Sequence, residues 1–179
     1  MKRILVSWPM LLLAVFVVAS CGKEKSSEED VSQYYIKCKI GSVDKTFKYA
    51  LVAHKEVVSG SGVTSYSIAG KVKNDPNDLE GIGFTIQSSI DLASGTTYKE
   101  TDPTIDYVLA CIYNPNTQDP DKMFASNMDE VNPFQITLTE ITSTSISGTF
   151  SGKLLPLNNT DPNADSAVIS NGIFKLKLQ

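Results

Sequence analysis

Apolar and polar residues alternate along most of the chain from residue 33 onward, and this alternation limits what the chain can fold into. Ile36, Cys38 and Ile40, for example, fall on one side of an extended segment, and the lysines between them fall on the other. A period of two residues is that of a half-buried β-strand, and apolar residues almost nowhere recur at helical spacing. The sequence therefore predicts an all-β domain over residues 33–179.

Further segments continue the pattern. The first of them, residues 47–53, should pair with residues 36–40 as a hairpin across the turn at 41–44. Residues 106–113 are apolar on both parities, which is typical of a central strand that is covered on both faces. The last three segments are spaced like adjacent antiparallel strands. The further predicted strands are 47–53, 66–73, 82–86, 96–99, 106–113, 134–138, 146–154 and 168–178.

Three glycines, Gly148, Gly152 and Gly172, fall on the inward parity of their predicted strands. A missing side chain at such a position often marks a bulge, a bend or the close approach of another backbone. Curvature of this kind favours a closed sheet over a flat one. We expect a single antiparallel β-sandwich or barrel-like domain of about eight to ten strands, and the sequence leaves sandwich and barrel open.

The beginning of the chain has the composition of a targeting signal. A charged start precedes an apolar run over residues 4–18, and small residues lead from Val18 to Cys21. This order is typical of a secretory signal peptide. A transmembrane helix fits less well, because it needs about twenty apolar residues, and Ser7 and Pro9 interrupt this shorter run.

The end of this leader, Val18-Ala19-Ser20-Cys21, resembles the lipobox of bacterial lipoproteins. The resemblance implies cleavage before Cys21, a diacylglycerol thioether on its sulfur, and an amine acylated with a fatty acid such as palmitate. Residues 22–32 are too polar to bury a core and are predicted to form a flexible tether. The predicted organisation is a cleaved lipoprotein signal peptide over 1–20, a lipidated cysteine and tether over 21–32, and the β-domain over 33–179.

The β-domain also carries a family resemblance, on the segments 35–47, 95–98, 134–142, 146–150 and 168–174. These segments resemble an uncharacterised family of Bacteroidetes outer-membrane lipoproteins, and the likeness covers most of the domain. It implies an all-β domain of unknown function without catalytic residues. It also implies a lipid-anchored protein of the outer membrane, on its periplasmic face or at the cell surface.

The charge of the chain bears on its partners. Loss of residues 1–20 removes Lys2 and Arg3, so that 16 − 2 = 14 basic residues, all lysine, face 20 acidic ones, and 14 − 20 gives −6. Without a guanidinium group, which binds phosphate with two parallel hydrogen bonds, nucleic acid is a poor partner. We expect the partners of this protein to be the membrane, bound through the lipid anchor, and a glycan or an envelope protein.

Catalytic patterns are sparse. His54 is the only histidine, so a metal site built on several imidazoles is excluded, and a serine-histidine triad could use only this residue. No glycine-rich phosphate loop follows a strand and opens a helix. We predict a protein that is not an enzyme and has no cofactor.

One segment has part of a metal-binding pattern. Asp161, Asn163 and Asp165 have the oxygen spacing of a calcium loop, which makes them a weak calcium candidate. Ser166 and Gly172 stand where the turn glycine and the bidentate glutamate belong, so we interpret the segment as a turn without metal.

Besides Cys21, three residues are candidates for covalent modification. Cys38 and Cys111 remain after Cys21 is lipidated, and they form either a disulfide in an oxidising compartment or two buried free thiols. Asp165-Ser166-Ala167 resembles the O-glycosylation site of exported Bacteroidetes proteins, which makes Ser166 a candidate for that modification.

A long connection over residues 114–133 is the candidate recognition segment, because loops of this length are generally functional or disordered. Asp121 could cap a short helix in which Met123, Phe124 and Met128 recur at helical spacing. Either this helix packs on the sheet, or the three side chains form an adaptable apolar recognition surface.

These features favour a non-catalytic, membrane-anchored lipoprotein that serves as a surface or periplasmic binding or structural module. A first alternative is a lipocalin-like carrier of a small apolar ligand, which requires an empty interior and is disfavoured by the large inward Phe, Leu and Ile residues. A second is a glycoside hydrolase, which would require two facing carboxylates. The sequence leaves open the ligand, the membrane leaflet or face, and the oligomeric state.

Overall fold

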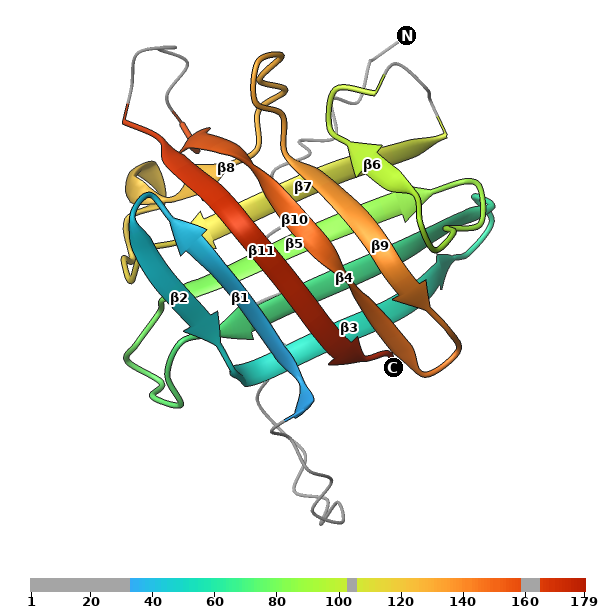
Figure 1. The fold of residues 1–179 in the computed structure, drawn as a ribbon, viewed down its shortest axis with the longest axis horizontal. Coiled ribbons are helices and arrows are strands. Elements are labelled where there is room, and N and C mark those ends of the chain that lie inside the picture. The colour runs from blue at the N-terminus through green and yellow to red at the C-terminus, as the bar shows by residue number, and fades with distance from the viewer. Residues whose placement is uncertain (1–32, 103–105, 159–164) are drawn as a thin grey trace, which may run out of the picture. The chain divides into compact units, whose positions relative to one another are not determined.

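Antiparallel strands make up most of the computed structural model, which describes residues 33–102, 106–158 and 165–179 (Figure 1). Their alternating burial follows the period-two pattern of the sequence. A 3₁₀ turn, Pro120–Lys122, precedes the eighth strand. The eleven strands are β1 (Tyr35–Ile40), β2 (Val43–Phe47), β3 (Tyr49–Val58), β4 (Val63–Lys71), β5 (Gly81–Ser88), β6 (Thr97–Lys99), β7 (Tyr107–Asn114), β8 (Phe124–Ala125), β9 (Gln135–Ile141), β10 (Ser145–Pro156) and β11 (Ala167–Lys177).

The strands form one sheet with the order β2-β1-β11-β10-β8-β7-β5-β4-β3, and β9 and β6 extend it from β10. Figure 1 shows β1, β11, β10 and β9 in a front layer that crosses a back layer of β3, β4, β5 and β7. Strand β10 passes from one layer to the other, because its end, Leu155 and Pro156, pairs with β8. The predicted run of three adjacent antiparallel strands, β9, β10 and β11, is confirmed.

The sheet nearly closes on itself. The backbone of Gln179, just after β11, exchanges two hydrogen bonds of 2.9 Å with Ala53 and Lys55 of β3. On the same side, only Lys48 separates β2 from β3, so the chain turns from the front layer into the back layer there. The all-β prediction of a sandwich or barrel-like domain is confirmed, with eleven strands where about eight to ten were expected.

The two layers meet on a group of phenylalanine rings. Phe84, on β5 of the back layer, lies 5.2 Å from Phe174 and 5.3 Å from Phe150, measured between ring centroids, and 6.1 Å from Phe134. Rings at these distances pack edge to face or tilted, and each buried ring contributes about 2–3 kcal/mol through burial. We call these four residues the phenylalanine cluster, and they fill the middle of the interior.

The inward glycines allow this packing, as predicted from their parity. A β-carbon on Gly172 would collide with the carbonyl oxygen of Phe150 and lie 2.7 Å from its ring. One on Gly148 would collide with the carbonyl oxygen of Thr137 and lie 2.9 Å from the ring of Phe174. Register shifts interrupt the ladder between Phe150 and Gly152, so the strands bend where the rings need room.

Two local predictions are wrong. Strand β7 is not covered on both faces: its residues alternate in burial, and Val108 is 63% exposed. Isolated β-branched residues are common on open sheet faces, so apolar residues on both parities do not require a second covering layer. The predicted 47–53 strand is also divided, because Phe47 ends β2 and the chain bends at Lys48 before β3 begins.

The predicted helix after residue 120 is absent as well. Asp119, rather than Asp121, caps the 3₁₀ turn, accepting a hydrogen bond of 3.0 Å from the backbone of Asp121. Phe124 and Ala125 then form β8 between β7 and β10. Pairing with two strands satisfies the backbone of this segment and places Phe124 against Tyr113, which outweighs its helical spacing.

We expect Gly172→Ala to lower the free energy of unfolding by about 3 kcal/mol, because its β-carbon overlaps the backbone and ring of Phe150. Gly83→Ala on β5 is the matched control, since a β-carbon there meets its neighbours at 3.5 and 3.6 Å, which is ordinary contact. Urea unfolding of both variants measures the difference. Equal stability of the two variants would contradict the packing argument.

Candidate functional site

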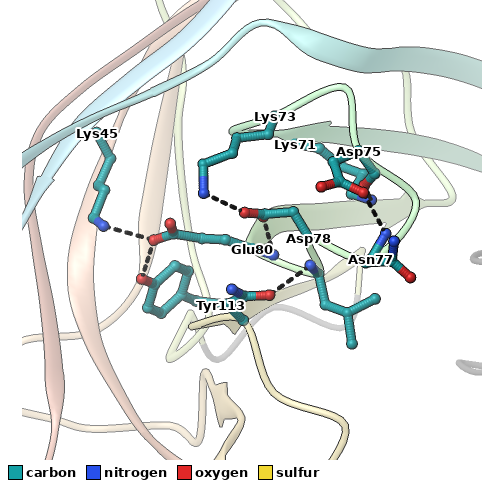
Figure 2. A network of polar contacts seen from close by, with 10 residues as sticks. Lys45, Lys71, Lys73, Asp75, Asn77, Asp78, Glu80 and Tyr113 are labelled. Atoms are coloured by element: carbon teal, nitrogen blue, oxygen red, sulfur yellow. Dashed lines mark hydrogen bonds and ion pairs between the residues drawn. The ribbon is translucent and has the colours of Figure 1, made fainter.

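A cluster of polar side chains ties the start of β5 to two other strands (Figure 2). One carboxylate oxygen of Glu80 accepts a hydrogen bond of 2.8 Å from the Tyr113 hydroxyl on β7. The same oxygen lies 2.7 Å from the Lys45 ammonium on β2, and only 14% of the Glu80 side chain is exposed. We call these three residues the Glu80 clamp, because they join the front layer to the back layer.

The loop before β5 is ordered by its own acidic residues. Asp78 forms an ion pair of 2.7 Å with Lys73, and its other carboxylate oxygen accepts a hydrogen bond from the backbone of Glu80 (Figure 2). Asp75 accepts in the same way from the backbone of Asn77. The hydrogen bond from Lys73 holds the pKa of Asp78 below its ordinary value and raises the pKa of Lys73.

The chemistry of the Glu80 clamp is that of a structural contact. Burial and then the hydrogen bond to Glu80 raise the pKa of Tyr113, so its hydroxyl stays protonated and donates. Lys45 donates to the same carboxylate, which is therefore occupied by two partners from two strands. An acid held in this way stabilises the closure of the sheet and is poorly placed to take a proton from a substrate.

Glu100, just after β6, is another carboxylate whose partners all belong to the chain itself. Glu100 is 6% exposed, and its two oxygens accept hydrogen bonds of 2.7 Å from the backbone of Phe134 and 3.0 Å from that of Met128. It thereby fixes the segment that leads into β9. Sequence reasoning missed Glu80 and Glu100, because an acid at a strand end looks like any surface residue until the backbone groups it meets are known.

The outer face of the front layer carries a shallow groove over β9, β10 and β11. Small hydroxyl residues occupy four successive outer positions of β10, from Ser145 to Ser151, and longer side chains stand around them, on the neighbouring strands and at Lys153 of β10 itself. Two cross-strand hydrogen bonds order the groove, between the hydroxyls of Thr97 and Thr137 at 2.7 Å and from the Gln135 amide to Ser151 at 3.3 Å. The groove is lined by Gln135, Thr137, Thr149, Phe150, Ser151, Ser170, Asn171, Gly172 and Ile173.

The two cysteines of the domain are both buried and free, so the disulfide that the sequence left open is not formed in this structure. Burial raises the pKa of Cys38 to about 12, against a smaller opposing effect of Lys45. Burial also raises the pKa of Cys111, and the neighbouring Cys38 adds to the effect. Both thiols therefore belong to the core.

The three residues of the candidate recognition segment are not equally exposed. Met123 and Phe124 are half-buried, and Phe124 stacks on Tyr113 with ring centroids 6.2 Å apart. Met128 is 65% exposed, while its backbone is held by Glu100. The packing alternative therefore fits Phe124, and a recognition role for Met128 stays a prediction.

The remaining predicted site residues are exposed or lie outside the described part of the chain. Ser166 and His54 are exposed, as is Asp165 of the calcium candidate. Cys21, Asp161 and Asn163 lie outside the described residues. Among the residues that are described, no three His, Cys, Asp or Glu side chains gather as a metal site.

Comparison with known proteins adds no relative, because no family model, no curated protein and no solved structure matches the chain. Within the described ranges, no helix has the length and apolar character needed to cross a membrane.

Tyr113→Phe tests the Glu80 clamp. We expect the free energy of unfolding to fall by about 2 kcal/mol, because a hydrogen bond to a charged acceptor is lost at a largely buried site. Tyr35→Phe is the control, since the contact made by that ring, to the Lys37 ammonium 4.5 Å away, is retained. Denaturant unfolding that gives the same loss for both variants would contradict the clamp.

Alkylation tests the state of the thiols. The rise in the pKa of Cys38 from 9.0 to about 12 lowers its thiolate fraction near neutral pH about a thousandfold, so we expect no labelling of the folded protein within hours. After denaturation without a reductant, Cys38 and Cys111 should both be alkylated, as mapped by peptide mass spectrometry. Protection of both in the denatured protein would instead demonstrate the disulfide.

Proposed function

We propose that this chain is a non-catalytic, lipid-anchored envelope protein whose β-domain serves as a binding or structural module. The observation that carries the proposal is the lipobox-like end of the leader, in which small residues lead from Val18 to Cys21 after a charged start and an apolar run. The polar segment 22–32 then supplies a spacer between the anchor and the domain.

The energetics of acyl chains support a stable anchor. Each buried methylene contributes about 0.8 kcal/mol, so one chain binds a membrane reversibly and two or three together bind it almost permanently. The resemblance of the domain to Bacteroidetes outer-membrane lipoproteins supports the outer membrane as the location, on its periplasmic face or at the cell surface.

The polar contacts of the domain support a role without catalysis. Glu80 is occupied by Lys45 and Tyr113, and Glu100 by two backbone amides. A glycoside hydrolase needs two carboxylates that face each other across about 5–10 Å of open cleft. The carboxylates of Glu80 and Glu100 instead make structural contacts with other groups of the chain.

The phenylalanine cluster supports a module rather than a carrier. A lipocalin-like carrier holds its ligand in the middle of the barrel. In this domain Phe84 occupies that space, with the rings of Phe150 and Phe174 within 5.3 Å of it. A ligand of the module would therefore bind at the outer surface.

Replacing Cys21 with Ser tests the anchor. We expect the variant to lose acylation with labelled palmitate and cleavage at residue 21, because the hydroxyl cannot replace the thiol in the thioether. Ser20→Ala is the matched control, since it keeps a small residue before an intact Cys21. Intact mass and membrane fractionation report the outcome, and a Cys21→Ser protein that is still cleaved, acylated and membrane-bound would reject the proposal.

A further inference from the structure

We infer that the groove on the outer face of β9, β10 and β11 binds an anionic polysaccharide that lies across the strands. The inference deepens the proposed function, on which it rests, by giving the module a ligand class and a site. It is carried by the register of the sheet, which brings neutral hydrogen-bonding side chains and lysines from five strands into single rows on one face.

The depth of the groove follows from side-chain size. Four successive outward residues of β10, Ser145, Ser147, Thr149 and Ser151, are short, and the next one, Lys153, is held in an ion pair of 3.1 Å with Asp129. The β-bulge of β11 adds Asn171, whose φ of 51° lies in the left-handed region that asparagine tolerates. The middle of the face is therefore low and rich in hydroxyl and amide groups.

One row of side chains crosses the groove from end to end. Lys99 of β6 pairs with Gln135 of β9, and Gln135 pairs with Ser151 of β10. Across the bulge of β11, Ser170 pairs with Lys39 of β1. Neighbouring strands lie about 4.8 Å apart, so the two lysines stand roughly 19 Å from each other with neutral polar groups between them. Beyond the row, on β2, the exposed carboxylate of Asp44 lies 4.0 Å from the Lys39 ammonium.

A second row brings another lysine to the same border. Thr137 of β9 pairs with Thr149 of β10, which pairs with Ile173 of β11, and Ile173 pairs with Lys37 of β1. Lys175 pairs with Tyr35, so Lys37 and Lys175 are diagonal neighbours on this face. The Lys37 ammonium lies 4.5 Å from the Tyr35 ring, and the positive charges of the two lysines at this border would attract an anion.

The arrangement matches an extended polyanion better than a compact anion or a lipid surface. Lysines at both ends of a row, separated by hydroxyl and amide groups, fit acid groups spaced along a chain of sugars whose own hydroxyls need hydrogen-bond partners. An anionic membrane would contact the lysines, but it would leave the polar groove between them unused. Because the chain is acidic overall, it repels an acidic polymer, and the lysine-bordered face is where such a polymer can approach.

Two pairs of variants test the site in the full-length protein, purified in neutral detergent. Lys39→Gln with Lys99→Gln removes both ends of the first row, and its matched control, Lys55→Gln with Lys122→Gln, removes two lysines of β3 and the 3₁₀ turn. Thr149→Glu places a negative charge in the groove, and Thr149→Gln has the same shape without the charge. The probes are oligogalacturonate, dextran sulfate, neutral dextran and phosphatidylglycerol vesicles.

We expect at least one of the two anionic glycans to bind, with an affinity that falls as salt rises from about 0.05 to about 0.5 M. Lys39→Gln with Lys99→Gln, and separately Thr149→Glu, should weaken binding about tenfold or more, while both controls should bind as the wild type. Binding of neither anionic glycan, equal binding of neutral dextran, equal loss in the controls, or binding to the vesicles alone would overturn the inference. Loss of acylation is a separate readout, so failure of the anchor proposal is distinguishable from failure of the site.

Discussion

The contact between the phenylalanine rings of the two layers is the interaction on which the rest of this domain depends. Phe84 comes from the back layer, and Phe134, Phe150 and Phe174 come from the front layer, so the rings join strands far apart in the sequence. The layers can approach this closely only because Gly148, Gly152 and Gly172 leave room for rings and backbone. Closure of the sheet at Gln179 and the Glu80 clamp then fix the edges of an arrangement that the core already requires.

The β-bulge of β11 affects both the core and the outer surface. At the bulge of β11, Gly172 faces inward against Phe150, and the extra residue, Asn171, is left on the outer face beside Ser170. The adjustment that lets the aromatic rings pack therefore also adds a polar side chain, that of Asn171, to the groove. A substitution at Gly172 would disturb both, whereas a substitution at Thr149 changes only the surface.

The fold could be predicted further from the sequence than the sites could. Alternation identified the strands of the last third and the inward glycines, because a strand that is buried on one face has apolar residues at every second position of the sequence. It failed where pairing decides the structure: Phe124 has helical spacing but lies in a strand between β7 and β10. The Glu80 clamp and the row from Lys99 to Lys39 depend on the register between strands distant in sequence, and no local pattern contains that register.

The charged groups of the domain divide into two kinds with different physical consequences. Glu80 and Glu100 are largely removed from water, so each must be paired within the chain, and losing a partner would cost stability. The lysines that border the groove lie at the surface, where even the 4.0 Å ion pair of Lys39 with Asp44 adds little to folding, so they remain available to a ligand. Stability and the proposed recognition are therefore carried by separate residues. A surface built in this way can change its ligand through exposed side chains alone, because none of them holds the layers together.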